Sequence, residues 1–416
     1  MGKKYDLLVV GAGPAGLMAA ITAAENGAET ILLERKDVPC KKLYATGNGR
    51  CNFTNLKMEE GVYRGGGSRL AEELTDEFDR NDLLHFMQSR GLMTKHIGDY
   101  VYPYNEQAGA VAALLLSECR RLGVRIICSA QVGDIKKSDK GGFEIFVSEN
   151  KTVYEAGNVL IAVGGKASPA HGSDGNLNRV IRSLGHKIIP QEPALVPLLF
   201  ADKSLSEMAG VRVKCGVLLN CHTKDGQRCY RERGEIIFNR DNISGIPVMQ
   251  LSRFAVMCLK EGGRATLELD LFPDDTKGEV SKLLGRAFTG CGDPYRSSLE
   301  ALSLCLHDKL ASYILKVKCS GSEPEKAIKW EKQQTDRLAD LLKHFRIELC
   351  GNAGFSRAQV TAGGVSADEV SSRLESRIVP GLFFAGEILD VDGTCGGYNL
   401  HWAFASGRKV GESVKR

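Results

Sequence analysis

Two short apolar runs near the start of the chain flank an alanine-rich stretch. Residues 5–10 are Tyr-Asp-Leu-Leu-Val-Val, and residues 30–34 are Thr-Ile-Leu-Leu-Glu. Continuous apolar runs of this length are typical of strands buried on both faces of a parallel sheet. The stretch between them, residues 14–26, predicts a helix that stops at Gly27. The opening of the chain therefore predicts a βαβ unit.

Runs of the same kind return later in the chain. Residues 159–163 are continuously apolar and end at Gly164-Gly165, and residues 381–387 form a similar run near the C-terminus. Before them, residues 110–116 predict a helix, residues 124–127 predict a strand, and residues 143–147 alternate as an antiparallel strand does. The C-terminal run lies in a tail too short to fold alone. We therefore expect it to complete the N-terminal sheet.

The pattern changes in the middle of the chain. Residues 191–270 are strand-like and rich in turns, with Asp225-Gly226 as a hairpin signal, and they predict an inserted β-barrel or sandwich. Leucines at helical spacing between residues 276 and 315 predict a small helical cap. Residues 328–345 predict one more helix.

Composition and charge argue against several classes of protein. The chain has 416 residues, too many for one compact core, and 55 basic and 51 acidic residues are interspersed to give a net charge of +4. Such a balance would not steer the protein onto nucleic acid or anionic lipid. No apolar run approaches the ~20 residues that span a bilayer, and no signal-peptide pattern opens the sequence. We expect a cytoplasmic protein with a small-molecule substrate, and neither a nucleic-acid nor a membrane partner.

Cysteine and histidine spacing predicts no metal site. The 13 cysteines are odd in number, no Cys-x-x-Cys pair occurs, and the eight histidines form no cluster with ligand spacing. A disulfide framework or a structural zinc ion is therefore not expected. Most of the cysteines are interpreted as small core residues with reduced thiols.

The turn after the first strand carries the strongest chemical signal. Residues 11–16 are Gly-Ala-Gly-Pro-Ala-Gly, a G-x-G-x-x-G motif between a strand and a helix, and Glu34 ends the second strand. Gly11 permits the tight turn, Gly13 lets the backbone approach a pyrophosphate, and Gly16 lets helix and strand pack closely. Glu34 can accept hydrogen bonds from an adenosine ribose and disfavours a 2′-phosphate there. FAD and NAD both remain compatible with this motif, and a turn used only for packing is the alternative.

Two further segments favour a flavin. Residues 35–55 form a basic, glycine-containing loop beyond the ribose acid, in which Lys42 or Arg50 could face phosphates or the flavin edge. Gly386-Glu387 closes a buried-type strand, and residues 396–400 open the last helix. A helix start aimed at the flavin N1–C2=O edge would stabilise the anion formed on reduction.

These segments carry a resemblance to a known family. The chain resembles the BaiN-like flavoproteins, also labelled the aminoacetone oxidase family. The segments that carry this resemblance are the fingerprint, the run Thr-Gly-Asn-Gly-Arg-Cys-Asn-Phe-Thr-Asn (46–55), and residues 101–104, 172–175, 361–365 and 386–407. The match departs from the family at Asn48, usually glycine, and at His401, often glutamine. The resemblance implies an α/β fold with a Rossmann-type FAD-binding domain interrupted by an inserted β-barrel domain and a small helical domain. Substrate would enter where the three meet.

The sequence patterns and what the family resemblance implies together give the predicted domain boundaries and site residues. The boundaries are 1–190 and 361–416 for the FAD-binding domain, 191–275 and 320–360 for the β-barrel domain, and 276–319 for the helical cap. The residues predicted to bind the cofactor are Gly11, Gly13, Pro14, Ala15, Gly16, Glu34, Arg35, Lys42, Asn48, Gly49, Arg50, Cys51, Val132, Gly164, Gly165, Gly386, Glu387, Asp392, Gly397, Tyr398, Asn399 and Leu400.

The predicted reaction passes hydride to the β-carbon of an enone while an acid protonates the α-carbon. The candidate catalytic residues are Tyr398, Tyr102 and His401, and packing is the alternative role for each. Cys51 and Cys395 lie in the glycine-rich segments and are interpreted as packing residues rather than a redox pair.

The resemblance implies reduction of a C=C bond conjugated to a 3-oxo group in a bile-acid-like steroid. Because the chain has a single G-x-G-x-x-G motif, NADH or NADPH would have to bind transiently over the flavin. The alternatives are an FAD oxidase that uses O₂ on a small amine, an RNA-modifying flavoprotein and a redox sensor.

Overall fold

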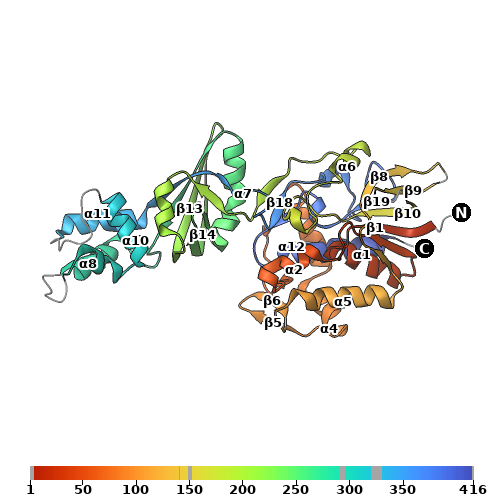
Figure 1. Cartoon of the computed structure of the whole chain (residues 1–416), viewed down its shortest axis with the longest axis horizontal. Helices are drawn as coiled ribbons and strands as arrows, with labels where there is room; N and C mark the ends of the chain where they lie inside the picture. The colour runs from red at the N-terminus through yellow and green to blue at the C-terminus, as the bar shows by residue number, and fades with distance from the viewer. Residues whose placement is uncertain (1–3, 140, 149–151, 290–295, 320–329, 415–416) are drawn as a thin grey trace. The chain divides into compact units, whose positions relative to one another are not determined.

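The computed structural model describes residues 4–139, 141–148, 152–289, 296–319 and 330–414. The chain divides into two compact units (Figure 1). The first contains residues 1–194 and 355–416, so both termini belong to it, and the second contains residues 195–354. Residues 320–329 of the predicted barrel segment 320–360 lie outside the described residues. So do residues 290–295 of the predicted helical segment 276–319.

A parallel sheet extended by antiparallel strands is the base of the first unit. Within the described residues it has seven strands in the order β7–β2–β1–β10–β9–β8, with β19 also paired to β10. The strands β7, β2, β1, β10 and β19 are parallel, and β9 is antiparallel to both β10 and β8. Their bounds are β1 Lys4–Val10, β2 Thr30–Leu33, β7 Arg125–Ile127, β8 Val132–Lys137, β9 Phe143–Val147, β10 Val153–Ile161 and β19 Leu382–Phe384.

The C-terminal strand completes the N-terminal sheet, as the sequence predicted. Residues 382–384 pair in parallel with residues 159–161. Leu7, Leu8 and Val9 have no exposed surface, which explains why β1 is apolar at consecutive positions. The predicted βαβ unit is also confirmed, because α1 (Pro14–Glu25) joins the parallel strands β1 and β2.

Shorter elements surround this sheet. Among the described residues there are three small sheets: β11 pairs with β18, β20 pairs with β4, and β6 pairs with β3 on one side and with β5 on the other. The strands are β3 Thr54–Asn55, β4 Tyr63–Arg64, β5 Thr94–Ile97, β6 Tyr100–Pro103, β11 Glu192–Ala194, β18 Val360–Ala362 and β20 Asp392–Gly393. The helices are α2 Lys41–Ala45, α3 Ser68–Glu77, α4 Arg80–Ser89, α5 Ala108–Arg121, α6 Asn178–Ser183 and α12 Tyr398–Ser413.

Helix α12 packs directly on α1 through residues without side chains. A Cβ atom on Gly407 would overlap the backbone of Ala15, and one on Gly411 would lie 2.6 Å from Cβ of Thr22. Glycines four residues apart lie on one face of a helix, so the two backbones approach closely along that face. The last helix of the chain is therefore fixed against the helix that follows the glycine motif.

The second unit contains the β-barrel that the sequence predicted. In the described part of the chain, six antiparallel strands close in the order β12–β15–β14–β13–β16–β17. The hairpin at Asp225-Gly226 is confirmed, because β13 and β14 pair from Thr223 and Gly226 outward. The strand bounds are β12 Leu198–Phe200, β13 Arg212–Thr223, β14 Gly226–Phe238, β15 Asn242–Ser244, β16 Arg264–Asp270 and β17 Phe345–Asn352.

Residues 191–270 were predicted to be strand-like and rich in turns, and one long segment among them is helical instead. Residues 246–260 form helix α7 (Ile246–Lys260), with Pro247 in its first turn. Its buried residues Val248, Leu251, Ser252, Ala255 and Val256 recur at helical spacing, so the helical period was present in the sequence. The ring of Phe254 stacks on that of Tyr230 of β14, with centroids 3.8 Å apart.

Helices cluster in the remainder of the second unit, as predicted. The described helices are α8 Lys277–Thr289, α9 Ser298–Ser303, α10 Asp308–Tyr313 and α11 Lys332–Lys343, and a π-helical turn, Ile314–Lys318, follows α10. Helix α11 packs against α8. Trp330 stacks on Phe288 and donates a hydrogen bond to Ser298 Oγ at 3.1 Å.

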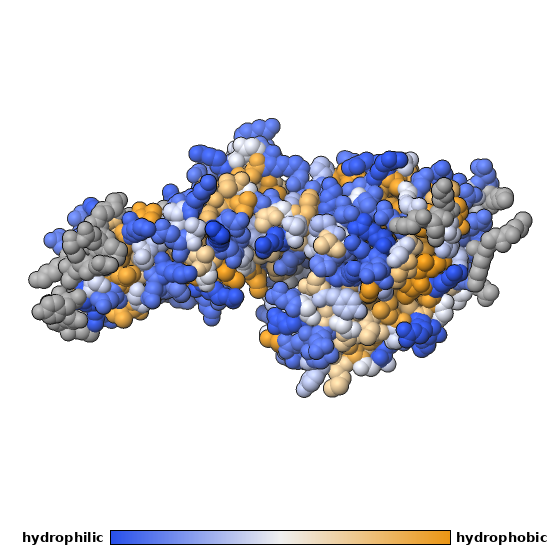
Figure 2. Space-filling model, viewed as in Figure 1, coloured by the Kyte–Doolittle hydropathy of each residue, from blue (hydrophilic) through white to orange (hydrophobic). Residues whose placement is uncertain are grey.

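No helix in the described ranges has both the length and the apolar character needed to cross a bilayer. On the face drawn in Figure 2, hydrophilic residues cover most of the surface, and hydrophobic residues gather around α1 and α5 of the first unit.

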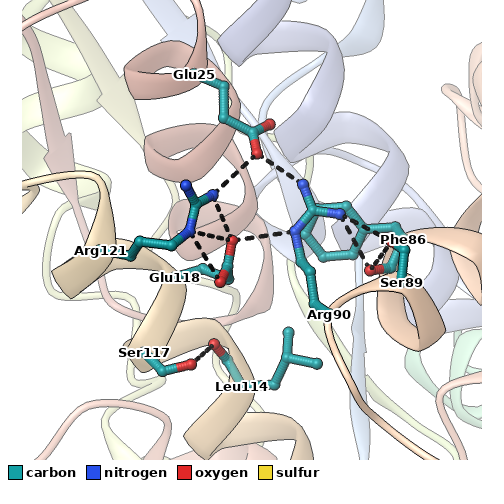
Figure 3. A network of polar contacts seen from close by, with 8 residues as sticks. All are labelled: Glu25, Phe86, Ser89, Arg90, Leu114, Ser117, Glu118 and Arg121. Atoms are coloured by element: carbon teal, nitrogen blue, oxygen red, sulfur yellow. Dashed lines mark hydrogen bonds and ion pairs between the residues drawn. The ribbon is translucent and has the colours of Figure 1, made fainter.

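A network of charges joins α1, α4 and α5 on the surface of the first unit (Figure 3). Arg90 bridges the carboxylates of Glu25, at 2.6 Å, and Glu118, at 3.2 Å. Arg121 contacts the same two carboxylates at 3.7 and 2.7 Å. The two arginines hold the pKa of Glu118 below its usual range, first through the hydrogen bond from Arg121. Because Glu118 is buried and shared by two arginines, we expect this network to contribute more to stability than an isolated surface ion pair does.

We predict that Glu118→Ala lowers the free energy of unfolding by about 1–2 kcal/mol, because it leaves two guanidinium groups without a partly buried partner. The matched control is Glu73→Ala, which removes the exposed partner of Arg69 in α3 and should cost less than about 0.5 kcal/mol. Urea unfolding of both variants measures the difference. Equal shifts of the two midpoints would show that the network adds no stability.

Candidate cofactor and active site

The three glycines of the fingerprint are required for different reasons. Gly11 has φ of +105°, and an added Cβ would lie 2.6 Å from the carbonyl oxygen of Ala162. A Cβ on Gly16 would overlap the carbonyl of Gly11 and lie 3.1 Å from Val9. Gly13 has φ of −84°, and no described atom lies within 4 Å of the Cβ position. The protein's own packing therefore explains Gly11 and Gly16, whereas Gly13 borders open space.

That open space lies at the positive end of a helix. Helix α1 starts with Pro14 after Gly13, has no side-chain cap and carries no acidic residue in its first turn. Uncapped N–H groups and the helix dipole favour an anion at such a position. A glycine without a packing reason in front of an uncapped helix start fits a bound pyrophosphate.

Glu34 links this turn to the end of β2. Its Oε2 accepts the N–H of Ala12 at 2.8 Å, and its Oε1 accepts the N–H of Lys36 at 2.8 Å. Each carboxylate oxygen keeps a further lone pair for a ligand hydroxyl. The Ala130 N–H bonds to the Glu34 carbonyl at 2.9 Å, which brings the chain that leads into Val132 beside the same strand end.

Two buried polar atoms without a hydrogen-bond partner lie on residues near the ends of β2 and β10. Nε of Arg35 and Oγ of Ser173 are buried and have no hydrogen-bond partner in the described part of the chain. Arg35 contacts Asp174 at 2.9 Å, and Cβ on Gly164 would lie 2.7 Å from Ser173 Oγ. Buried polar groups in folded proteins are normally satisfied, so these atoms indicate a polar ligand at this end of the sheet.

A second cluster joins the ends of β10, β18 and β19. Glu387 accepts Lys42 Nζ at 2.6 Å on Oε2 and the Thr361 N–H at 3.1 Å on Oε1. The hydroxyl of Thr361 accepts the N–H groups of Lys166 and Ala167 at 2.8 and 2.9 Å. A Cβ on Gly165 would overlap Thr361, so these predicted residues meet at one place. Sequence reasoning missed Thr361, although residues 361–365 carried part of the family resemblance.

The start of α12 is likewise an uncapped helix end. Gly397 precedes it with φ of +94°, and a Cβ there would lie 2.7 Å from the carbonyl of Thr54. Asn399 closes the preceding turn by accepting the Gly393 N–H at 2.8 Å and donating to its carbonyl at 2.9 Å. Leu400 is half-buried on the first turn, and Asp392 is buried on β20.

The starts of α1 and α12 point the same way. Gly407 lies against Ala15 and Gly411 lies against Thr22, so residue numbers rise together along both helices. The N–H of Gly386 donates to Ser406 Oγ at 3.0 Å, which fixes the end of β19 on the same helix. Since α12 begins at Tyr398, nine residues before Gly407, its start lies about 14 Å beyond that of α1. One extended molecule could therefore engage both positive ends.

The loop before β3 has an unusual backbone. Gly47, Asn48, Gly49 and Cys51 have positive φ of 56°, 56°, 85° and 58°. A non-glycine residue in this region costs roughly 1–2 kcal/mol, and such strain is concentrated at functional sites. The side-chain oxygen of Asn52 in this loop is buried without a partner in the described ranges. The loop is thus a second place that fits a polar ligand.

The side chain of His401 lies in the interior of the first unit. Its side chain is fully buried, with Nε2 2.8 Å from the carbonyl of Phe78 and Nδ1 2.7 Å from Thr54 Oγ1. The carbonyl can only accept, so Nε2 carries the proton and Nδ1 accepts the threonine hydroxyl. Both ring nitrogens are used inside the protein, which favours packing, the alternative role that the sequence left open for His401.

The candidate tyrosines differ in what their hydroxyls do. Tyr398 donates to the carbonyl of Lys57 at 2.8 Å, and burial raises its pKa to about 12. Tyr102 has the Arg50 guanidinium 5.3 Å from its ring centroid, and Arg50 also contacts Glu106 at 3.5 Å. Tyr398 is therefore engaged in packing its own helix start, whereas Tyr102 lies in a charged environment.

The two cysteines of the glycine-rich segments lie in different surroundings. Cys51 is fully buried near Thr46 and Cys40, and burial raises its pKa to about 12. Cys395 lies beside Tyr100. A thiol with so high a pKa is a poor nucleophile, which supports the packing interpretation for Cys51. Within the described residues, no group of three or more His, Cys, Asp or Glu side chains could hold a metal ion.

The chain is similar to several known proteins. The family model described as "HI0933-like protein Rossmann domain" matches residues 5–413. The chain is 36% identical over 412 residues to the 3-dehydro-bile acid delta(4,6)-reductase of Clostridium scindens, with 98% of each chain covered. It is 27% identical over 411 residues to the ribosomal RNA dihydrouridine synthase of Escherichia coli, covering 97% of this chain and 96% of that protein.

Among solved structures, the chain is similar to a 3-ketosteroid-delta4-(5alpha)-dehydrogenase from Rhodococcus jostii. The TM-score is 0.51 at 17% identity, with 99% of this chain and 97% of that chain covered. A likeness at this identity shows the fold. Together with the family model and the closed barrel within residues 195–354, it confirms the predicted fold class, a Rossmann-type α/β domain with an inserted barrel.

The glycine geometry gives the first prediction for this site. Gly13→Ala should fold with an unchanged unfolding midpoint, because its φ suits any residue and nothing lies in the way, yet bind FAD at least about tenfold more weakly. Gly16→Ala should instead destabilise the protein through its overlap with Gly11. Thermal unfolding of the apoprotein and FAD titration separate the two effects. Full FAD affinity in Gly13→Ala would contradict a pyrophosphate at this position.

The buried histidine should make the stability of the protein depend on pH. Burial lowers the pKa of His401, so the folded state excludes a proton that the unfolded chain takes up below about pH 6.5. Stability is therefore lost as pH falls below that value. His401→Gln keeps a donor toward Phe78 and an acceptor toward Thr54, and should flatten the stability–pH curve between pH 6.5 and 5 while leaving catalysis intact. His85→Gln, at an exposed position, is the control and should leave the slope unchanged.

Proposed function

The chain belongs to the HI0933-like Rossmann family, and on that premise we propose that it is an FAD-dependent oxidoreductase that reduces a C=C bond conjugated to a carbonyl. The proposed substrate is a steroid-like 3-oxo enone, and the proposed electron donor is NADH or NADPH. The parallel, offset starts of α1 and α12 are the observation that carries this proposal.

The residues of the first unit fit FAD along its length. We assign the adenosine to Glu34, Arg35, Val132 and Gly164, and the pyrophosphate to the fingerprint turn. The ribityl chain would lie near the cluster of Lys42, Gly165, Gly386 and Glu387. The flavin would lie between the strained loop (46–51) and the start of α12. When bound and reduced, FAD supplies the hydride equivalent for the reaction.

The names of two relatives suggest a shared chemistry. One is a bile acid delta(4,6)-reductase and the other a ribosomal RNA dihydrouridine synthase. Dihydrouridine differs from uridine by two hydrogens across a C=C bond that is conjugated to a carbonyl. A steroid enone has the same reacting unit, so the common reaction is reduction of an activated alkene.

A steroid-like substrate is favoured over RNA for this chain. The identity to the bile acid reductase is 36%, against 27% to the RNA-modifying protein. The net charge of +4 comes from interspersed residues, whereas RNA-binding surfaces concentrate basic side chains. The small-amine oxidase considered from the sequence has no counterpart among these relatives.

The nicotinamide donor would lack a Rossmann turn of its own. Residues 65–67 are three glycines before α3, but each is explained by packing, because Cβ atoms there would meet Asp390 or Val391. Within the described residues, the glycine turn before α1 is therefore the one that fits a dinucleotide. A donor that binds transiently over the flavin is consistent with this arrangement.

We predict that NADH or NADPH reduces the FAD-loaded protein anaerobically and that a 3-oxo-4-ene steroid reoxidises it. Stopped-flow absorbance measures both half-reactions, and mass spectrometry should show a product two hydrogens heavier. Ribosomal RNA and small amines serve as competing substrates in the same assay. Failure of both nicotinamides to bleach the flavin, or peroxide formation from an amine with no reaction of the enone, would overturn this assignment.

A further inference from the structure

One side of the small sheet β3–β6–β5 borders the start of α12. Asn55 pairs with Tyr100, and Lys95 pairs with Tyr102, so these side chains share one face of the sheet. Asn55 Nδ2 donates to the carbonyl of Gly396 at 2.9 Å, and the ring of Tyr100 lies 3.2 Å from the Cβ position of Gly396. This face therefore adjoins the loop that enters α12.

The phenols near this loop are not equally available. Tyr398 donates to the carbonyl of Lys57, and Tyr63 donates to the carbonyl of Tyr398 at 3.1 Å. The hydroxyl of Tyr102 has no hydrogen-bond partner among the residues that the structure describes, although the residue is only 5% exposed. A buried phenol with an uncommitted O–H can donate a proton to a ligand.

Charged groups surround Tyr102 on that face. The Arg50 guanidinium lies over the ring, and Glu106 binds both Arg50, at 3.5 Å, and Lys95 Nζ, at 2.6 Å. Tyr100 precedes it on β6 and shares the face. Burial raises the pKa of Tyr102, and Arg50 opposes that shift. The Tyr102 phenol is therefore protonated at neutral pH, and the positive charge of Arg50 would stabilise the phenolate that forms when the proton is lost.

We propose that Tyr102 is the acid that protonates the substrate, and that Arg50, held by Glu106, is the positioning residue that stabilises the phenolate left behind. This inference rests on the proposed function. A hydride equivalent adds to the β-carbon of the enone, and the alkene electron pair moves to the carbonyl oxygen as an enolate. The α-carbon then takes the proton from Tyr102, and the phenolate recovers a proton from water.

The first test replaces the phenol. Tyr102→Phe should lower the rate of enone reduction by about 100-fold or more, while FAD affinity and the rate of flavin reduction by the nicotinamide stay unchanged. Tyr104→Phe is the matched control, because Tyr104 follows closely on the same chain but is 58% exposed and contacts Lys95 instead of Arg50. Wild-type rates of enone reduction in Tyr102→Phe would overturn the proposal.

A binding measurement tests the same residue without turnover. A steroid with a phenolic A-ring mimics the enolate and should bind the oxidised, FAD-loaded protein at least about tenfold more weakly in Tyr102→Phe than in Tyr104→Phe. Equal affinities would contradict the role of Tyr102. If wild-type protein binds this steroid more tightly than Tyr102→Phe yet reduces no enone, the proposed function fails, while the placement of the Tyr102 phenol against the bound steroid ring stands.

The role of Arg50 has its own readout. The rate of enone reduction should fall at high pH as Tyr102 ionises, and Arg50→Met should move this fall to higher pH because it removes the cation that stabilises the phenolate. Arg50→Lys should restore much of the wild-type profile. A pH profile that is identical in all three proteins would show that Arg50 does not act through Tyr102.

Discussion

The contact between α1 and α12 is the constraint on which the rest of the first unit depends. Gly407 and Gly411 bring the backbone of the last helix against Ala15 and Thr22 of the first one. Larger residues would separate the helices, and the two uncapped helix starts would then lose their fixed offset. Because chain ends held in this way form one body, residues 195–354 can be inserted between them as a separate unit.

The candidate site combines rigid support with local strain. Glycines at positions 11, 16 and 397 are required because backbone or side chains already occupy the space where a Cβ would lie. The loop that contains Asn48 and Cys51 adopts left-handed conformations at an energetic cost. Strain of this kind persists only where surrounding packing fixes the chain, and in this loop the side chain of Cys51 is fully buried.

Electrostatics divides the site into two regions. Near the fingerprint and β19, charged groups are paired with each other or with backbone N–H groups, as Lys42 is with Glu387. Near β6, burial raises the pKa values of phenols that are already neutral at physiological pH, so they keep their protons over a wider pH range. The first arrangement suits a permanently bound anion, and the second suits transient proton transfer to a substrate.

The sequence by itself determined the periodic and local features. The apolar runs of β1, β10 and β19, the glycine turn and the hairpin at Asp225-Gly226 depend on neighbouring residues, so pattern and spacing were sufficient. Helix α7 was missed because it lies between two strands of the barrel, and its helical spacing of apolar residues was interpreted as part of the strand-rich region. Only the tertiary structure decided the hydrogen-bond partners of His401, the convergence of Thr361 with Glu387, and the pairing of Arg50 with Tyr102. Each of these depends on contacts between residues distant in sequence, and no local pattern encodes which partners a buried polar side chain will meet.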